Sequence, residues 1–285
     1  MNPPNPSPDL PAILAISSHV AVGHVGNAAA APALERMGFE VWRVDTVKFS
    51  NHPAHKEGFT GKIAASDAIG DLLAGIGRLT GWTGCGGVYT GYMGEAGTPA
   101  AIAPHLDAAR AADPKLVVLC DPVIGDHGRV FVRDGVEDGI LEVLLPRADV
   151  ITPNAFELSR IAGCGVTDLE TAATAAQIAR DRLRTAGPRI VVGTGVPISE
   201  SEIGLVMAWD GAPIVIRQPR RDRPFFGTGD LFSGLFLGHM LRTGDPTQAL
   251  NRAASGLRVA TEVTEAAGRV DLDLIRNLDA IVAAR

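Results

Sequence analysis

The chain has 285 residues, of which 46% are hydrophobic and only 5% aromatic. This length can bury a large core, and the composition favours helices packed on a sheet over a β-sandwich. The formal net charge of −6, without a large Lys/Arg cluster, argues against nucleic-acid binding, and no apolar stretch is long enough to predict a membrane span.

Three well-separated cysteines predict reduced thiols and a cytoplasmic protein. The Pro-rich start has no signal-peptide pattern, so we expect a disordered tail over residues 1–11. With no internal repeat and no clear linker, residues 12–285 are predicted to form a single domain.

Short apolar runs alternate with helical patterns along the chain. We expect strands at 13–16, 40–44, 87–89, 116–120, 150–151, 190–192, 204–208 and 214–216. We expect helices at 27–37, 99–112, 155–162, 168–186, 229–242 and 246–267. Strands separated by helices are typical of βαβ units, so the sequence predicts an α/β fold with a mostly parallel sheet covered on both faces.

Polar or glycine residues follow six of the expected strands. They are Ser17-Ser18-His19, Asp45-Thr46, Gly91-Tyr92, Asp121, Asn154 and Thr194. Ligands of open parallel sheets bind beyond the carboxyl ends of the strands. The pattern therefore predicts a site along one edge of the sheet.

The segment Gly227-Thr228-Gly229-Asp230 precedes an apolar helical pattern. Its glycines allow close approach to a ligand, and the free N–H groups at the helix start favour an anion such as a transferring phosphoryl group. Asp230 could then accept a proton from an attacking hydroxyl. Alternatively Asp230 only caps the helix, and the motif alone leaves both interpretations open.

A nucleotide-binding alternative comes from residues 16–30, where Gly23 and Gly26 separate a strand from a helix and Asp45 ends the next strand. The GxGxxG fingerprint is absent, which argues against a dinucleotide site. GxxxxGK[ST] is also absent, which excludes a P-loop kinase.

Asn154 and Glu157 are three residues apart at an expected helix start. This spacing is typical of an ordinary capping box. It also allows Glu157, together with Asp121, to orient Mg²⁺ through water. A separate pair, His52 and His55, lies in a Pro-interrupted loop, which favours a polar ligand-facing loop over a zinc site.

Six segments together resemble pyridoxal kinases of the ribokinase-like superfamily. They are SHVxxGHVGN (18–27), TVKFSNH (46–52), TGYMG (90–94), CDPVIGD (120–126), ADVITPNAFE (148–157) and FFGTGDLFSG (225–234). The resemblance extends from about residue 13 to residue 265, in the family's order. It implies a ribokinase-like three-layer αβα sandwich with a mostly parallel central sheet.

The resemblance also implies ATP-dependent phosphorylation of the 5′-hydroxyl of pyridoxal, pyridoxine or pyridoxamine, as in vitamin B6 salvage. Mg²⁺, a monovalent cation such as K⁺, and a homodimer are implied with it. Two alternatives stay open: a related kinase acting on hydroxymethylpyrimidine or a sugar, and a non-catalytic vitamer-binding protein.

Residue by residue, the resemblance implies four groups of site residues. Ser18, Val25, Val47, Phe49, His52 and Tyr92, with Asp230, would surround the pyridine ring. Asp121, Thr152 and Glu157 would serve the cations, and Asp121, Asn154, Thr194, Gly195 and Thr228 the nucleotide phosphates. Asp230 would be the base, with Gly227, Thr228 and Gly229 stabilising the phosphoryl group.

The chain departs from the family pattern in three places. Pro53 stands where many relatives have Thr, so a hydroxyl contact is lost or is replaced by His55. The expected lid, residues 125–134, is short, which predicts less complete closure. Gly193-Thr194-Gly195 replaces a bulkier pair and is expected to loosen the nucleotide site.

Overall fold

The computed structural model describes residues 10–285. The first half contains β1 (Ala12–Val20), α1 (Asn27–Arg36), β2 (Val41–Phe49), β3 (Gly61–Ile63), α2 (Ser66–Thr80), β4 (Cys85–Thr90), α3 (Thr98–Ala112), β5 (Val117–Cys120), β6 (Gly125–Asp126), β7 (Arg129–Val130) and α4 (Val136–Gly139). After the helical turns 140–147 come β8 (Val150–Ile151), α5 (Ala155–Ala162), α6 (Leu169–Arg180), β9 (Ile190–Pro197), β10 (Glu202–Ala208), β11 (Ile214–Pro219), α7 (Thr228–Thr243), α8 (Pro246–Ala266) and α9 (Leu278–Ala283).

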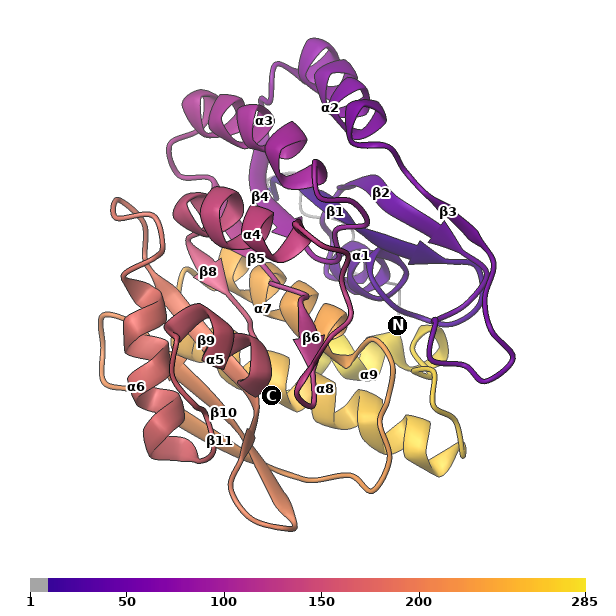
Figure 1. Cartoon of the computed structure of the whole chain (residues 1–285), viewed down its shortest axis with the longest axis vertical. Helices are drawn as coiled ribbons and strands as arrows, with labels where there is room; N and C mark the ends of the chain where they lie inside the picture. The colour runs from indigo at the N-terminus through magenta and orange to yellow at the C-terminus, as the bar shows by residue number, and fades with distance from the viewer. Residues whose placement is uncertain (1–9) are drawn as a thin grey trace.

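One nine-stranded sheet runs through the described residues in the order β11-β10-β9-β8-β5-β4-β1-β2-β3 (Figure 1). Its central strands, from β2 to β9, pair in parallel. Antiparallel pairs occur only towards the edges, where β3 joins β2 and where β10 joins β9 and β11. The predicted mostly parallel sheet is therefore confirmed.

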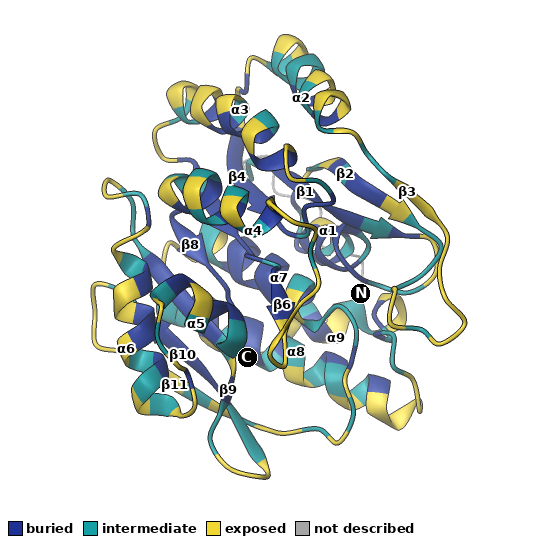
Figure 2. Cartoon of the chain, viewed as in Figure 1, coloured by how far each residue is buried: buried dark blue, intermediate teal, exposed yellow. Residues whose placement is uncertain are grey.

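Each face of the sheet is covered by helices, and each interface has its own hydrophobic core (Figures 1 and 2). On one face, Ile69 of α2, Leu106 of α3 and Leu158 of α5 belong to one buried cluster. On the other, Leu34 of α1 and Phe232 of α7 belong to a second cluster, which α8 and α9 complete. The predicted three-layer αβα arrangement is confirmed.

Several predicted strand ends are wrong, because β1, β2 and β9 continue further than their apolar runs. Ser17-Ser18-His19, Asp45-Thr46 and Thr194 therefore lie inside strands instead of following them. Ser17 pairs with Asp45 and His19 with Lys48, with a register shift between the two pairs. Backbone pairing extends the ladder here regardless of side-chain polarity.

The helix expected over 168–186 ends early, at Arg180. The chain turns because the Arg184 amide donates to Ala148 O (3.1 Å) and its guanidinium lies 2.7 Å from the buried Asp149 carboxylate.

Helix α2 was not predicted from the sequence. Its apolar residues recur at helical spacing, but Gly70, Gly75 and Gly77 lower its helix propensity.

Of the expected tail, residues 1–9 lie outside the described residues. Leu10 and Pro11 are half-buried, and Leu10 packs against the core under α1 and α7. Within residues 10–285, no helix combines the length and apolar character needed to span a membrane.

Candidate active site

The turn before α7 has a backbone that only glycine suits. Gly227 has φ +88°, and a Cβ there would lie 1.8 Å from the His24 carbonyl oxygen. The turn therefore packs directly against the loop between β1 and α1. Thr228 begins α7, and its hydroxyl donates to Phe225 O at 3.3 Å. The next residue, Gly229, is exposed, so the helix start is accessible.

Asp230 lies in the first turn of α7 and is half-buried. The N-cap residue is Gly227, so Asp230 is not the N-cap itself, but its carboxylate accepts a hydrogen bond from its own backbone N–H in the first turn. Its Oδ1 accepts a 2.8 Å hydrogen bond from the Tyr89 hydroxyl, and the Gly26 N–H also donates to the carboxylate. Burial raises the pKa of Asp230 above its ordinary value, although the hydrogen bonds from Gly26, Tyr89 and its own backbone N–H oppose the shift.

Tyr89 is a site residue that the sequence analysis missed. Its side chain is fully buried in β4, where a hydroxyl needs a partner. Burial, together with the charges of Asp230 and Asp121, raises its pKa well above the ordinary value, so the hydroxyl stays protonated and donates. Ser17 also bonds this hydroxyl, and Ser17 Oγ accepts from the Tyr92 amide at 3.2 Å. A chain of hydrogen bonds thus joins the turn at Tyr92 to Asp230.

The six residues expected around the pyridine ring belong to neighbouring segments. Ser18 lies near the end of β1 and Val25 in the loop that follows, and a Cβ on Gly26 would lie 2.1 Å from Ser18 O. Val47 and Phe49 are on β2, where Phe49 pairs with Val20 of β1. The Thr46 hydroxyl donates to Tyr92 O at 2.7 Å, which holds the turn after β4 beside β2.

His52 contacts the segment that precedes the glycine turn. Its ring stacks on Phe226, with centroids 4.1 Å apart and planes 19° from parallel. His55 meets the same ring edge-on at 5.3 Å, and its Nε2 lies 3.1 Å from the Asp271 carboxylate. Phe226 and Asp271 were not among the predicted site residues. Pro53 is exposed, and the bond to Asp271 occupies His55 Nε2, the group expected to replace the lost hydroxyl.

Glu157 is buried at the start of α5. Its Oε1 accepts from the Ile124 and Gly125 amides (2.9 and 3.4 Å), and its Oε2 from the Asn154 amide (2.9 Å). Asn154 Oδ1 accepts from the Glu157 amide in return, so the predicted capping box is confirmed. Burial raises the pKa of Glu157 to about 8, although these N–H groups favour the charged form.

Asp121 directly follows β5 and is buried beside two further carboxylates. Burial raises its pKa well above the ordinary value, and the charges of Glu157 and Asp230 raise it further. Thr152 and Ser233 bond the Asp121 carboxylate and share a 2.8 Å hydrogen bond with each other.

The chemistry of this donor set suits a cation that also contacts phosphate. Carboxylates that repel one another are relieved by a bound positive charge, and Mg²⁺ takes one or two carboxylates plus water and phosphate oxygens. Across residues 10–285, no three His, Cys, Asp or Glu side chains form a complete metal cage. The oxygen ligands present therefore fit a cation that is bound partly by phosphate and water better than a cation enclosed by protein alone.

The expected nucleotide residues Asn154 and Thr194 lie beside each other at the start of α5. Asn154 Nδ2 donates to Gly125 O at 2.8 Å, and the Thr194 amide donates to Pro153 O at 2.8 Å. Asn154 and Thr194 also form an isolated parallel bridge. Gly195 has φ +61° with open space around it, whereas a Cβ on Gly193 would lie 3.0 Å from Leu158 of α5.

The expected lid is a hairpin of two short strands, β6 and β7. His127 and Gly128, at its tip, both have positive φ (48° and 77°), as a two-residue type I′ turn requires. Val130 and Phe131 beside it are 46% and 55% exposed. The hairpin thus presents apolar side chains to solvent next to the Gly125–Asn154 contact.

Known proteins resemble this chain over nearly its whole length. A profile of the phosphomethylpyrimidine kinase family matches residues 82–272. The pyridoxal kinase PdxY of Deinococcus radiodurans is 41% identical over 281 residues, which are 94% of this chain and 92% of the relative. The corresponding protein of Granulibacter bethesdensis is 37% identical over 264 residues, or 91% and 92% of the two chains.

Solved structures of pyridoxal kinases have the same fold as this chain. Pyridoxal kinase from Leishmania donovani, in complex with ADP and pyridoxamine, has a TM-score of 0.86 at 26% identity and covers 95% of this chain and 96% of that one. The Entamoeba histolytica pyridoxal kinase has the same fold, with a TM-score of 0.88 at 24% identity and 97% of each chain covered. By its sequence identity to relatives along more than nine-tenths of its length, the chain belongs to the pyridoxal kinase PdxY family.

Proposed function

We propose that this chain transfers the γ-phosphoryl group of ATP to the 5′-hydroxyl of pyridoxal, pyridoxine or pyridoxamine. The observation that carries the proposal is the half-buried Asp230 carboxylate, oriented by Tyr89 at the accessible start of α7. Family membership supports ATP and a B6 vitamer as the reactants.

In the proposed reaction, Asp230 accepts the proton of the 5′-hydroxyl as its oxygen attacks the γ-phosphorus. A new P–O bond forms, the bond to the β-phosphate oxygen breaks, and ADP leaves. The amides of Gly227, Thr228 and Gly229, with the partial positive charge of the α7 start, stabilise the negative charge on the transferring group.

We assign Asp121, Thr152 and Glu157 to the cation region, which would take Mg²⁺ and a monovalent cation such as K⁺. A bound Mg²⁺ would neutralise part of the negative charge of the phosphate groups. Because three backbone amides already bond the Glu157 oxygens, this residue is assigned a contact through water.

The remaining roles follow the positions of the residues. Ser18, Val25, Val47, Phe49, His52 and Tyr92 would surround the pyridine ring, and Asn154, Thr194, Gly195 and Thr228 the nucleotide phosphates. The hairpin of β6 and β7 is proposed to close over those phosphates. The homodimer remains a prediction from the family resemblance and the cytoplasmic location a prediction from the cysteine pattern. Light scattering coupled to gel filtration would test the dimer.

The acceptor is tested by competition. The enzyme is given ATP, Mg²⁺ and equal concentrations of pyridoxal, pyridoxine, pyridoxamine, hydroxymethylpyrimidine and ribose, and products are identified by mass spectrometry. We expect the 5′-phosphate of a B6 vitamer as the main product. The Asp230→Asn variant should lose about 10²–10⁴-fold in kcat, as removal of a positioned base does.

Three other results would contradict parts of the proposal. Faster phosphorylation of hydroxymethylpyrimidine, the alternative acceptor that the sequence leaves open, would overturn the acceptor. Vitamer binding without turnover would identify a binding protein. Near-normal kcat in Asp230→Asn would overturn only the assignment of the base.

A further inference from the structure

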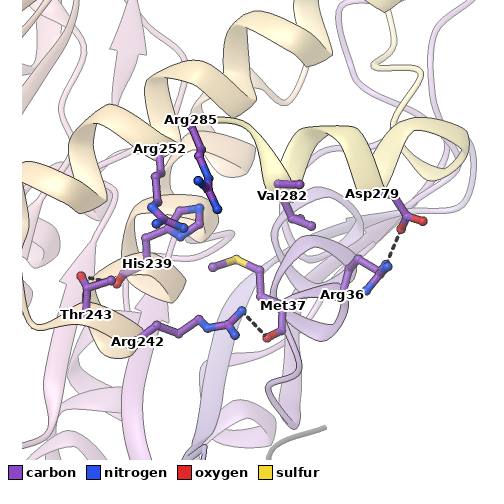
Figure 3. Close-up of a pocket in the computed structure, with 10 residues that line it drawn as sticks. Arg36, Met37, His239, Arg242, Thr243, Arg252, Asp279, Val282 and Arg285 are labelled. Carbon is purple, nitrogen blue, oxygen red and sulfur yellow. Dashed lines mark hydrogen bonds and ion pairs between the residues drawn. The ribbon is translucent and has the colours of Figure 1, made fainter. Parts of the chain in front are cut away.

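A cavity of about 400 Å³ lies at the C-terminal end of α7, away from the candidate active site (Figure 3). It is lined by the ends of α1 and α7, by α8 and by the last residues of the chain. Asp230 is in the first turn of α7 and His239, nine residues later, lines the cavity. That separation corresponds to roughly 14 Å along a helix axis, so the two sites are distinct.

Four arginines converge on this cavity. They are Arg36, Arg242, Arg252 and Arg285, and Asp279 is the one acidic side chain among the lining residues. Asp279 is already paired with Arg36. The cavity therefore carries an excess of positive charge, and bringing like charges together is unfavourable unless an anion accompanies them.

Ordinary structural roles account for only two of the arginines. Arg36 and Arg242 stand in the last turns of α1 and α7, where the helix dipole favours cations, and Arg242 Nη1 donates to Met37 O at 3.1 Å. Arg252 lies inside α8, away from its ends. For Arg252 and Arg285, the described part of the chain offers no hydrogen-bond or ion-pair partner.

His239 supplies an independent observation. It is only 3% exposed, and its Nε2 is buried with no hydrogen-bond partner within residues 10–285. In Figure 3 the His239 and Arg252 side chains lie together, and Arg285 extends towards them. An unpaired buried nitrogen is costly, and such a group indicates an absent partner. Burial and the charges of Arg252 and Arg242 lower the pKa of His239 to about 4. The imidazole is therefore neutral near pH 7, and its absent partner is a hydrogen-bonding group and not a counter-ion.

We propose that this cavity binds a phosphate group, carried by inorganic phosphate or by a small phosphate monoester. Arginine guanidinium groups bind phosphate oxygens in bidentate fashion, and an imidazole N–H donates to the same oxygens. Met37 and Val282 give the cavity an apolar side that suits the organic part of a monoester. The site requires no catalysis at Asp230 and is independent of the proposed kinase activity.

The test follows His239 directly. Protein labelled with ¹⁵N-histidine is titrated with sodium phosphate in one arm and glycerol 3-phosphate in the other, at constant ionic strength. The imidazole resonances of His239 are identified by their absence in His239→Asn. We expect a saturable shift of these resonances that is separate from any change at His52 and His55 near the candidate active site.

Matched variants identify the arginine contribution. Arg252→Ala should weaken binding about 10- to 100-fold, as loss of charge-assisted hydrogen bonds does. Arg258→Ala, which removes a charge from the same helix where Arg258 pairs with Glu262 at 3.0 Å outside the cavity, should leave the affinity unchanged. Tighter binding of glycerol 3-phosphate than of phosphate would identify a monoester as the ligand, and equal binding would identify the free anion.

The proposal is overturned if no saturable shift of His239 occurs up to tens of millimolar of either anion. It is equally overturned if sodium chloride alone reproduces the shift, because that result indicates screening. Equal weakening by Arg252→Ala and Arg258→Ala would overturn it too, since it would reflect net charge instead of a site.

Discussion

The buried Tyr89 hydroxyl donates a 2.8 Å hydrogen bond to Oδ1 of Asp230, although the two residues are 141 positions apart in the sequence. Because the donor cannot ionise at neutral pH in this environment, it fixes one carboxylate oxygen of Asp230. Tyr89 is thus a positioning residue for the candidate base.

The Tyr89→Phe variant keeps the ring and removes this hydrogen bond. Since the bond lowers the pKa of Asp230, its loss should raise that pKa and move the acidic limb of kcat/KM to higher pH. The measurement is a pH–rate profile of the vitamer kinase reaction. Tyr92→Phe, in the ring pocket, is the control and should change KM without moving the limb. An unshifted limb in Tyr89→Phe would show that the hydroxyl only supports packing.

Alanine substitutions at Gly227 and Gly229, at the start of α7, are predicted to change the free energy of unfolding in opposite directions. In Gly227→Ala the new methyl would lie 1.8 Å from His24 O on a left-handed backbone. We expect a loss of more than about 2 kcal/mol in the free energy of unfolding. In Gly229→Ala the nearest atom is Asp121 Oδ2 at 3.7 Å, so the methyl fits, and alanine adds up to about 1 kcal/mol of helix propensity.

Activity separates the two glycine variants further. The methyl of Gly229→Ala occupies the accessible helix start, where the phosphoryl group is proposed to bind, so kcat/KM should fall roughly tenfold or more at unchanged or higher Tm. Urea unfolding and steady-state kinetics on both variants provide the check. Full activity in Gly229→Ala would argue against phosphoryl binding at this turn.

Magnesium should stabilise the free protein through the carboxylate cluster. Because Glu157 and Asp230 disfavour the charged form of Asp121, a cation that binds the native state adds stability by mass action. We expect millimolar MgCl₂ to raise the Tm of the wild type and to have little effect on Asp121→Asn. Asp107→Asn, in an exposed pair with Arg147, is the control. Equal gains in all three proteins would mean that Mg²⁺ binds elsewhere.

The parts that local sequence predicts well are those with local causes. The start of α7 at Thr228 and the capping box of Asn154 and Glu157 depend on residues within one turn of a helix. Strand continuation at Ser17 depends instead on pairing with β2. Tyr89 contacts Asp230, which is 141 positions away, and Asp271 contacts His55, which is 216 positions away. No local pattern marks such partners, although a tyrosine within an apolar strand indicates that some partner must exist.

His239 gives the stability of the protein a testable pH dependence. The native pKa of about 4 lies below the ordinary 6.5, so the unfolded chain binds a proton on acidification before the native state does. The contribution of this histidine to stability is therefore complete above pH 6.5 and is lost progressively as the pH falls towards 4. Between pH 7 and pH 5 the wild type should lose more free energy of unfolding than His239→Asn, as measured by urea denaturation.

A constant difference between the two urea curves at every pH would reflect packing alone and would contradict this titration. His127→Asn is the matched control, because the His127 side chain is 91% exposed, and it should follow the wild type. Phosphate provides a second arm. An anion beside His239 offsets the repulsion from Arg252 and Arg242 that lowers its pKa, so saturating phosphate should reduce the acid loss in the wild type and not in His239→Asn. Acid sensitivity and anion binding would then have the same origin in one unpaired imidazole.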